Sequence, residues 1–253
     1  MNNSCKKRKL PAAAALLGCA AALLRVMLYG LAQEQRGLLV QGHPLTWALI
    51  VLSAAALAII GFGAWKLDGS GEYCHNFGPN PRAFAGHLAA AAGIGITMLT
   101  RMPQMYGYLG QLWRLLGWLS PLCLVAAGFA RKKGKQPFFL LHLIPCLFLA
   151  VHIVNHYQQW CADPQLHNYA FALFGQMALM FFAFYTAAFD ANIGQRRMQL
   201  FMGLSAVYLL LAELVTTRYF WLLAGGIAWA ITDLCSLTPV PKPEKPTDTQ
   251  KES

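Results

Sequence analysis

Eight apolar runs, each about as long as a bilayer is thick, follow one another along the 253 residues. Their expected boundaries are 11–31, 45–65, 83–100, 112–130, 137–157, 166–189, 198–217 and 219–237. A helix needs roughly 20 apolar residues to cross a membrane, because every backbone N–H and C=O must find its partner within the segment. The sequence therefore predicts an all-α membrane protein, a bundle of about eight transmembrane helices.

Lys and Arg are concentrated between alternate apolar runs. If the N-terminus is cytoplasmic, the cytoplasmic segments together hold fifteen of the 20 Lys and Arg residues. Positive residues beside membrane helices are retained on the cytoplasmic side. The pattern predicts that both termini are cytoplasmic, in a cell membrane and most simply a bacterial inner membrane. It also accounts for the net charge of +10, so the lipid bilayer is an expected partner and nucleic acid is not.

The chain divides into three segments by composition. It is 57% hydrophobic and 12% charged, whereas a soluble domain carries about 25% charged residues. Residues 1–10 are a basic N-terminus, residues 11–237 the helical bundle, and residues 238–253 a Pro-rich cytoplasmic tail that we expect to be disordered. A basic start followed by an apolar run also describes a cleaved signal peptide. Because apolar sequence continues well beyond Cys19, an uncleaved first helix is expected.

The arrangement of the helices is only partly indicated by the sequence. Gly86, Gly93 and Gly95 in the third run are small residues that let membrane helices approach closely, so this helix is expected inside the bundle. Residues 66–82, rich in Gly, Pro and Asn, predict a loop. Each half of the bundle begins with a basic cluster and a Pro-led run. A parallel repeat of four plus four helices is therefore an alternative, although the spacing of matching features differs between the halves.

Arg25 and Glu213 are the clearest anomalies within apolar runs. From the rise per residue, Arg25 lies about 21 Å along the first run and Glu213 about 22 Å along the seventh. Both positions fall in the outer third of the membrane, at matching depth and with opposite charge. Ionisable residues inside a span usually face the protein interior and are candidates for function. We expect the two side chains to pair, or to hold a zwitterionic or polar ligand together; the alternative is that each reaches the outer interface separately.

The fifth run carries polar residues along one side of its predicted helix. His152 and His156 are four residues apart and therefore share a face, and Asn155 lies beside them. Such a stripe could line a polar cavity, or the two histidines could ligate a metal or haem. It could also consist of interfacial and packing residues, because these positions lie in the outer third of the span.

Other polar residues in the runs lie near the predicted inner ends. His87 is one turn into the third run, Asp190 ends the sixth beside Arg196 and Arg197, and Asp233 lies in the inner third of the eighth. Charged residues are common at a membrane interface. We therefore expect ordinary packing or interfacial roles for these three.

Motifs of soluble enzyme chemistry are missing from the sequence. It has no phosphate-binding Gly loop, no HExxH or GxSxG motif and no paired carboxylates at helical spacing, and its seven cysteines lack metal-ligand spacing. A role other than catalysis is expected, with no catalytic or metal-ligating residue assigned and no cofactor indicated.

The leading hypothesis is a small-molecule binding or transport component with an outward-facing polar pocket. Its expected ligand-binding residues are Arg25, His152, Asn155, His156 and Glu213. One alternative is a structural or accessory subunit that has other membrane subunits as partners and whose buried polar residues serve helix association. Another is an intramembrane redox or metal enzyme that uses the His-rich fifth helix.

Overall fold

The structure, a computed structural model, describes residues 3–32, 42–67, 70–100, 107–160 and 169–237. Within these residues the chain forms helices and no strand. The helices are α1 (Asn3–Leu31), α2 (Pro44–Trp65), α3 (Tyr73–Asn76), α4 (Pro81–Thr100), α5 (Tyr108–Lys132), α6 (Leu140–Trp160), α7 (Ala170–Asp190), α8 (Arg196–Glu213) and α9 (Phe220–Ser236). The predicted tail, residues 238–253, lies outside the described residues.

A long helix lies on each predicted apolar run, which identifies an α-helical, multi-pass membrane protein. Six of these helices are long and apolar enough to cross a membrane: α1 from Leu10 on, α2, α4, α5, α6 up to Gln158, and α7. Helix α9 has 17 residues, and the 18 residues of α8 include Arg196, Arg197 and Glu213. The expected loop 66–82 differs from the prediction, because it contains the short helix α3.

Proline and local hydrogen bonds set where several helices begin. Pro44 occupies the first turn of α2, where no N–H donor is needed, and Nδ1 of His43 accepts a hydrogen bond from the N–H of Leu45 at 3.3 Å. At the start of α4, Oδ1 of Asn80 accepts from the N–H of Arg82 at 2.8 Å. These bonds replace intrahelical partners that the first turn of a helix lacks.

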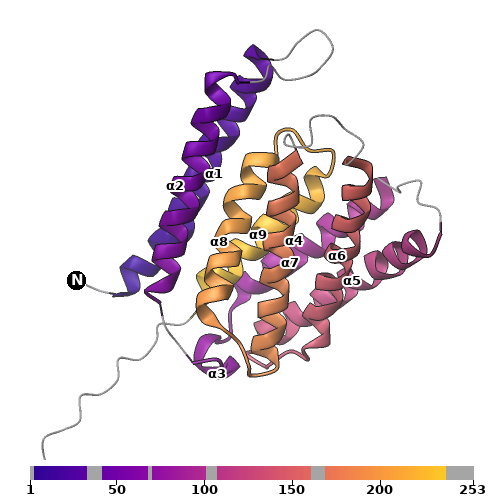
Figure 1. Cartoon of the computed structure of the whole chain (residues 1–253). Coiled ribbons are helices and arrows are strands. Elements are labelled where there is room, and N and C mark those ends of the chain that lie inside the picture. Colours follow the sequence, from indigo (N-terminus) through magenta and orange to yellow (C-terminus); the bar gives the residue numbers. More distant parts are fainter. Residues whose placement is uncertain (1–2, 33–41, 68–69, 101–106, 161–168, 238–253) are drawn as a thin grey trace, which may run out of the picture.

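The α1–α2 hairpin stands at one side of the molecule and packs on α8, while α4 lies between α5 and α9 (Figure 1). The short helix α3 lies at the lower edge of this view, at the ends of the helices that the charge pattern predicts to be cytoplasmic. We call these the inner ends and the opposite ones the outer ends.

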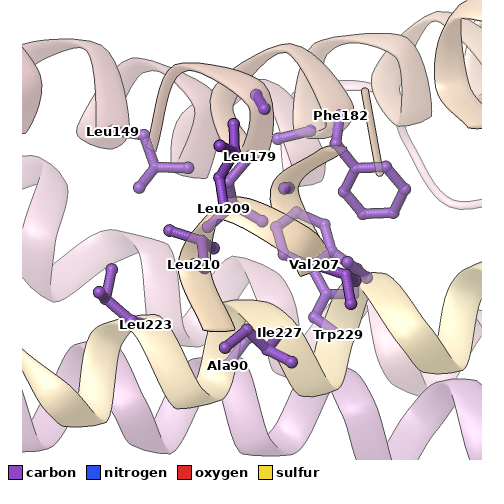
Figure 2. Close-up of a cluster of buried hydrophobic side chains, with 14 of the residues drawn as sticks. Ala90, Leu149, Leu179, Phe182, Val207, Leu209, Leu210, Leu223, Ile227 and Trp229 are labelled. Carbon is purple, nitrogen blue, oxygen red and sulfur yellow. The ribbon is translucent and has the colours of Figure 1, made fainter. Parts of the chain in front are cut away.

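Large apolar side chains fill the middle of the bundle (Figure 2). Leu149 of α6, Leu179 of α7 and Ile227 of α9 lie there about midway along their helices, together with Leu210 from the outer part of α8. All four helices carry a buried polar residue towards the inner end, and α6 and α8 carry one at the outer end as well. The apolar layer therefore separates two polar clusters, one towards each side of the membrane.

Candidate functional site

Arg25 of α1 and Glu213 of α8 form a buried ion pair at the outer ends of their helices. Nη1 of Arg25 donates to Oε2 of Glu213, and the two residues are 3% and 5% exposed. The second carboxylate oxygen of Glu213 accepts from the hydroxyl of Thr216 at 3.3 Å. The guanidinium of Arg25 also lies 5.0 Å from the ring centroid of Phe171. The two anomalous charges of the sequence therefore meet, and α7 contributes an aromatic face to the cation.

His152 and His156 of α6 pack against Tyr219, the residue just before α9. Their rings are 4.3 Å apart between centroids, and the Tyr219 ring lies 5.2 Å from His152 and 4.5 Å from His156. His152, Asn155 and His156 are all buried. Interfacial exposure, one of the alternatives, therefore does not describe them in this structure.

The hydrogen bond from Trp113 determines the tautomer of His152. The indole N–H of Trp113 lies 3.1 Å from Nδ1 of His152. Since tryptophan can only donate, Nδ1 must accept, and the neutral ring carries its proton on Nε2. This Nε2 is buried and has no hydrogen-bond acceptor among the described residues. It is a desolvated donor inside the outer part of the bundle.

That tautomer does not suit metal or haem ligation by Nε2 of His152. A metal binds the lone pair of a neutral imidazole nitrogen, and the other ring N–H normally donates to a neighbour. Here the lone pair is on Nδ1 and Trp113 occupies it. Ligation through Nε2 would need this hydrogen bond to break. The donor set therefore does not fit the redox or metal-enzyme alternative.

The turn between α8 and α9 connects the two outer features. It begins at Glu213 of the ion pair and ends at Tyr219, which contacts both histidines. We call the five predicted residues the outer cluster: Arg25, His152, Asn155, His156 and Glu213. All five are buried, so a ligand could reach them only if the outer helix ends moved apart.

A second buried polar cluster lies at the inner ends, and sequence reasoning did not find it. We call it the inner cluster; it comprises His87 of α4, Arg131 of α5, His142 of α6, Asp190 of α7 and Asp233 of α9, each at most 5% exposed. Packing or interfacial roles were expected for His87, Asp190 and Asp233. The structure instead places them in one network inside the protein, because the inner ends of five helices converge there.

A continuous chain of hydrogen bonds runs through the inner cluster. Nδ1 of His142 contacts Oδ2 of Asp190, and Nε2 of His142 lies 2.9 Å from Nε2 of His87. Nδ1 of His87 lies 2.8 Å from the backbone carbonyl oxygen of Ala83. The His142 ring also stacks on the indole of Trp229, with an interplanar angle of 11°. This stacking holds the His142 ring in the plane in which both of its nitrogens make their hydrogen bonds.

Asp233 and Arg131 lie beside this chain. Oδ1 of Asp233 is 3.9 Å from Nδ1 of His87, and its Oδ2 is 3.9 Å from Nη2 of Arg131. Neither separation is a hydrogen bond. The guanidinium of Arg131 instead lies 3.7 Å from the ring centroid of Phe77. Among the described residues, the side-chain nitrogens of Arg131 and both oxygens of Asp233 have no hydrogen-bond partner.

Helix α3 closes the inner cluster towards the predicted cytoplasm. Asn76 accepts from Nη1 of Arg196 at 2.9 Å, and the hydroxyl of Tyr73 donates to the carbonyl of Lys135 at 3.1 Å. Burial raises the pKa of the Tyr73 phenol above its ordinary value, against the opposing effect of the nearby Arg131 charge. The short helix thus binds α5 and α8 and shields the carboxylates behind it.

One group of potential metal ligands lies on the surface of α3. Ligand atoms of Glu72, Cys74 and His75 lie within 4.8 Å of one another, and Nδ1 of His75 is 2.8 Å from Oε2 of Glu72. All three side chains are exposed. Such exposed groups are common without a metal, and nothing else in the described structure points to an ion there.

No family model matches the chain, and no match was found among curated proteins or among solved structures.

Proposed function

We propose that the chain is a multi-pass membrane component that binds or transports a small polar molecule through the outer cluster. The observation that carries the proposal is the buried Nε2 donor of His152, which has no acceptor among the described residues. An unsatisfied buried donor costs about 1–3 kcal/mol. A ligand oxygen at this position would remove that cost.

Arg25 and Glu213, the charged members of the outer cluster, would suit a zwitterionic ligand. The guanidinium of Arg25 matches a carboxylate, and the carboxylate of Glu213 matches an ammonium group. In the present structure these two groups satisfy each other. We interpret this as a closed arrangement, in which a ligand would exchange one ion pair for two. Charged groups inside membrane proteins commonly mark such substrate pathways.

The same ion pair supports a second candidate, an accessory subunit of a membrane complex. Because Arg25 and Glu213 already neutralise each other, they join α1 to α8 without any ligand. In that case the polar residues would serve helix association, and other membrane subunits would be the partners.

We also propose that all eight long helices span the membrane, with both termini cytoplasmic and the protein in a bacterial inner membrane. The alternating basic segments support this topology. At 1.5 Å per residue, even α9 extends about 25 Å.

The four-plus-four repeat is not part of this proposal. Such a repeat would make α4 equivalent to α8 and α9 equivalent to α5, so a contact between α4 and α9 would be matched by one between α5 and α8. Helix α4 packs closely on α9, but α5 and α8 form no such contact.

A thermal-shift screen of the detergent-purified protein tests the binding site. The compounds are amino acids, sugars, vitamins, lipids, haem and divalent metals, because a ligand that binds the native state raises the melting temperature. In His152→Asn, the amide oxygen can take the place of Nδ1 and accept from Trp113, but the Nε2 donor is lost. The matched control is His43→Asn, which changes a histidine whose Nδ1 accepts a helix-capping N–H.

A ligand of the outer cluster should shift wild type and His43→Asn but not His152→Asn. An equal shift in His152→Asn would place the binding site elsewhere. If no compound shifts wild type and a stoichiometric membrane protein co-purifies with it, the accessory role replaces the proposal.

A further inference from the structure

We propose that His87, His142 and Asp190 hold one shared proton and form a proton-transfer site at the inner ends of α4, α6 and α7. The site is separated from the outer cluster by the apolar layer. It does not depend on the binding role of the outer cluster.

The number of protons follows from the hydrogen bonds. Three bonds connect four groups in series: the Asp190 carboxylate, the His142 ring, the His87 ring and the Ala83 carbonyl. Each bond needs one proton. The Ala83 carbonyl can only accept, so Nδ1 of His87 must carry a proton. Two ordinary neutral histidines and an ionised aspartate would supply two protons in total. The hydrogen-bonded series holds three protons. This is one more than its separate groups would bind above the histidine pKa of about 6.5.

This additional proton has three positions that keep all three hydrogen bonds. It can make His142 an imidazolium, it can make His87 an imidazolium, or it can reside on Asp190. To pass from His142 to His87, the N–H bond at Nε2 of His142 breaks and one forms at Nε2 of His87. To pass from His142 to Asp190, the Nδ1–H bond breaks and an O–H bond forms. Neither step needs a heavy atom to leave its partner.

Charge balance in the cluster supports the additional proton. The charged groups facing the chain are the carboxylate of Asp233 from α9 and the guanidinium of Arg131 from α5. Tyr73 of α3 is neutral, and the buried cation Arg196 of α8 donates to Asn76 rather than to these groups. Among the groups directly beside the hydrogen-bonded series, two carboxylates, one guanidinium and one additional proton sum to zero. The additional proton therefore reduces the negative charge at the two carboxylates themselves, which a low-dielectric interior disfavours.

Asp233 is the group that could continue the transfer. The series of hydrogen bonds ends at the Ala83 carbonyl, which cannot take up a proton. Oδ1 of Asp233 lies 3.9 Å from Nδ1 of His87, about 1 Å beyond a hydrogen bond. This carboxylate is fully buried and has no hydrogen-bond partner within the described residues. A rotation of the Asp233 side chain that closes this gap would let it accept the proton, and such Asp–His chains serve as proton relays in pumps and transporters.

Asp190→Asn is the decisive variant because all three hydrogen bonds of the series can form in it without the additional proton. Its amide can donate to Nδ1 of His142, as a protonated Asp190 would. His142 can then donate to His87, and His87 to Ala83, with both rings neutral. The variant should fold with near wild-type stability. If it did not fold, the wild-type spectra alone would still decide the question.

The measurement combines ¹⁵N NMR and infrared spectroscopy on the full-length, ¹⁵N-histidine-labelled protein in lipid nanodiscs, at about pH 8, well above the ordinary histidine pKa. His87→Gln and His142→Gln assign the resonances. In wild type we expect either three protonated nitrogens among the two rings, or two together with a protonated carboxyl band that Asp190→Asn removes. In Asp190→Asn we expect two protonated ring nitrogens at the same pH. Two protonated ring nitrogens and an ionised Asp190 in wild type would overturn the proposal.

A second readout uses the linkage between proton binding and stability. On this proposal, the native site holds one proton more than the same groups bind in the unfolded protein above the ordinary histidine pKa of about 6.5. Unfolding then releases that proton, so the stabilisation that the proton gives is lost as pH rises. While the folded site remains protonated, the unfolding equilibrium constant of wild type should rise about tenfold per pH unit relative to Asp190→Asn. Equal slopes for the two proteins would contradict the shared proton.

Discussion

Arg25 and Glu213 are separated by 188 positions in the chain, yet they form an ion pair inside the membrane region. The pair joins α1, the first helix, to α8, the last but one. Phe171 of α7 covers the cation from a third helix. A hydrogen bond of 2.8 Å between Ser53 of α2 and Tyr208 of α8 is a further polar contact between the α1–α2 hairpin and the bundle.

Removing one partner of the ion pair should destabilise the fold strongly. Arg25→Met leaves Glu213 buried and uncompensated, and Glu213→Leu does the same to Arg25. Each single variant should lose about 3–5 kcal/mol in the free energy of unfolding. The double variant Arg25→Met/Glu213→Leu should recover most of that loss, since an apolar pair of similar volume can replace a buried ion pair. Thermal unfolding in detergent measures all three. Single effects that simply add in the double variant would show that the pair is not coupled.

The close approach of α4 and α9 should depend on glycine at two positions. A Cβ atom added to Gly93 would lie 2.3 Å from the carbonyl oxygen of Trp221, and one added to Gly225 would lie 2.7 Å from that of Ala89. Backbone atoms cannot move aside as a side chain can. Gly93→Ala and Gly225→Ala should each cost about 1–3 kcal/mol of stability, measured by thermal unfolding.

Gly95 offers a matched control on the same helix. Nothing lies within 4 Å of a Cβ atom added there, so Gly95→Ala should be neutral or stabilise the helix by up to about 1 kcal/mol. Equal losses for Gly93→Ala and Gly95→Ala would mean that the helices do not meet at Gly93.

The aromatic face beneath Arg131 should contribute to stability. The guanidinium lies over Phe77 and is buried, and a desolvated cation–π contact is worth about 2 kcal/mol or more. Phe77→Leu keeps an apolar side chain but removes the π face. The control is Phe84→Leu, whose ring faces the exposed Lys132 at 5.3 Å. We expect Phe77→Leu to lower the free energy of unfolding by about 1–2 kcal/mol more than Phe84→Leu does. Similar losses would indicate that only aromatic packing is involved.

Two native cysteines can test the topology. Cys74 is exposed on α3 at the predicted inner side. Cys161 falls in a predicted outer loop and lies outside the described residues. In variants that retain only one of them, a membrane-impermeant maleimide added to intact cells should label Cys161 at once and Cys74 only after permeabilisation. The reverse order would invert the proposed orientation.

The outer cluster could be anticipated because its charges stand out. Arg25 and Glu213 each interrupt an apolar run, and counting residues from the inner or outer end gives them the same depth. Such a count says nothing about which helices touch. It could not predict that Phe171 covers Arg25, nor that Trp113 occupies Nδ1 of His152, because both contacts depend on helix packing.

The inner cluster escaped prediction for a physical reason. Near the end of a span, a His or Asp can always reach water, so His87, Asp190 and Asp233 individually gave no signal. The usable signal was collective: polar residues occupy a similar depth on α4, α6, α7 and α9. Whether such residues face one another depends on helix rotation. It also depends on α3, whose four residues come from a segment that reads as a loop.

The distance between Arg25 and Glu213 along the chain also sets an order of events during synthesis. A ribosome that adds about 5–20 residues per second needs roughly 10–40 s to make the 188 residues between them. Throughout that interval Glu213 does not yet exist to pair with Arg25. The long side chain can meanwhile extend to the outer headgroups. Docking of the α1–α2 hairpin must therefore be among the last steps of assembly, when the newly made α8 draws Arg25 back into the protein.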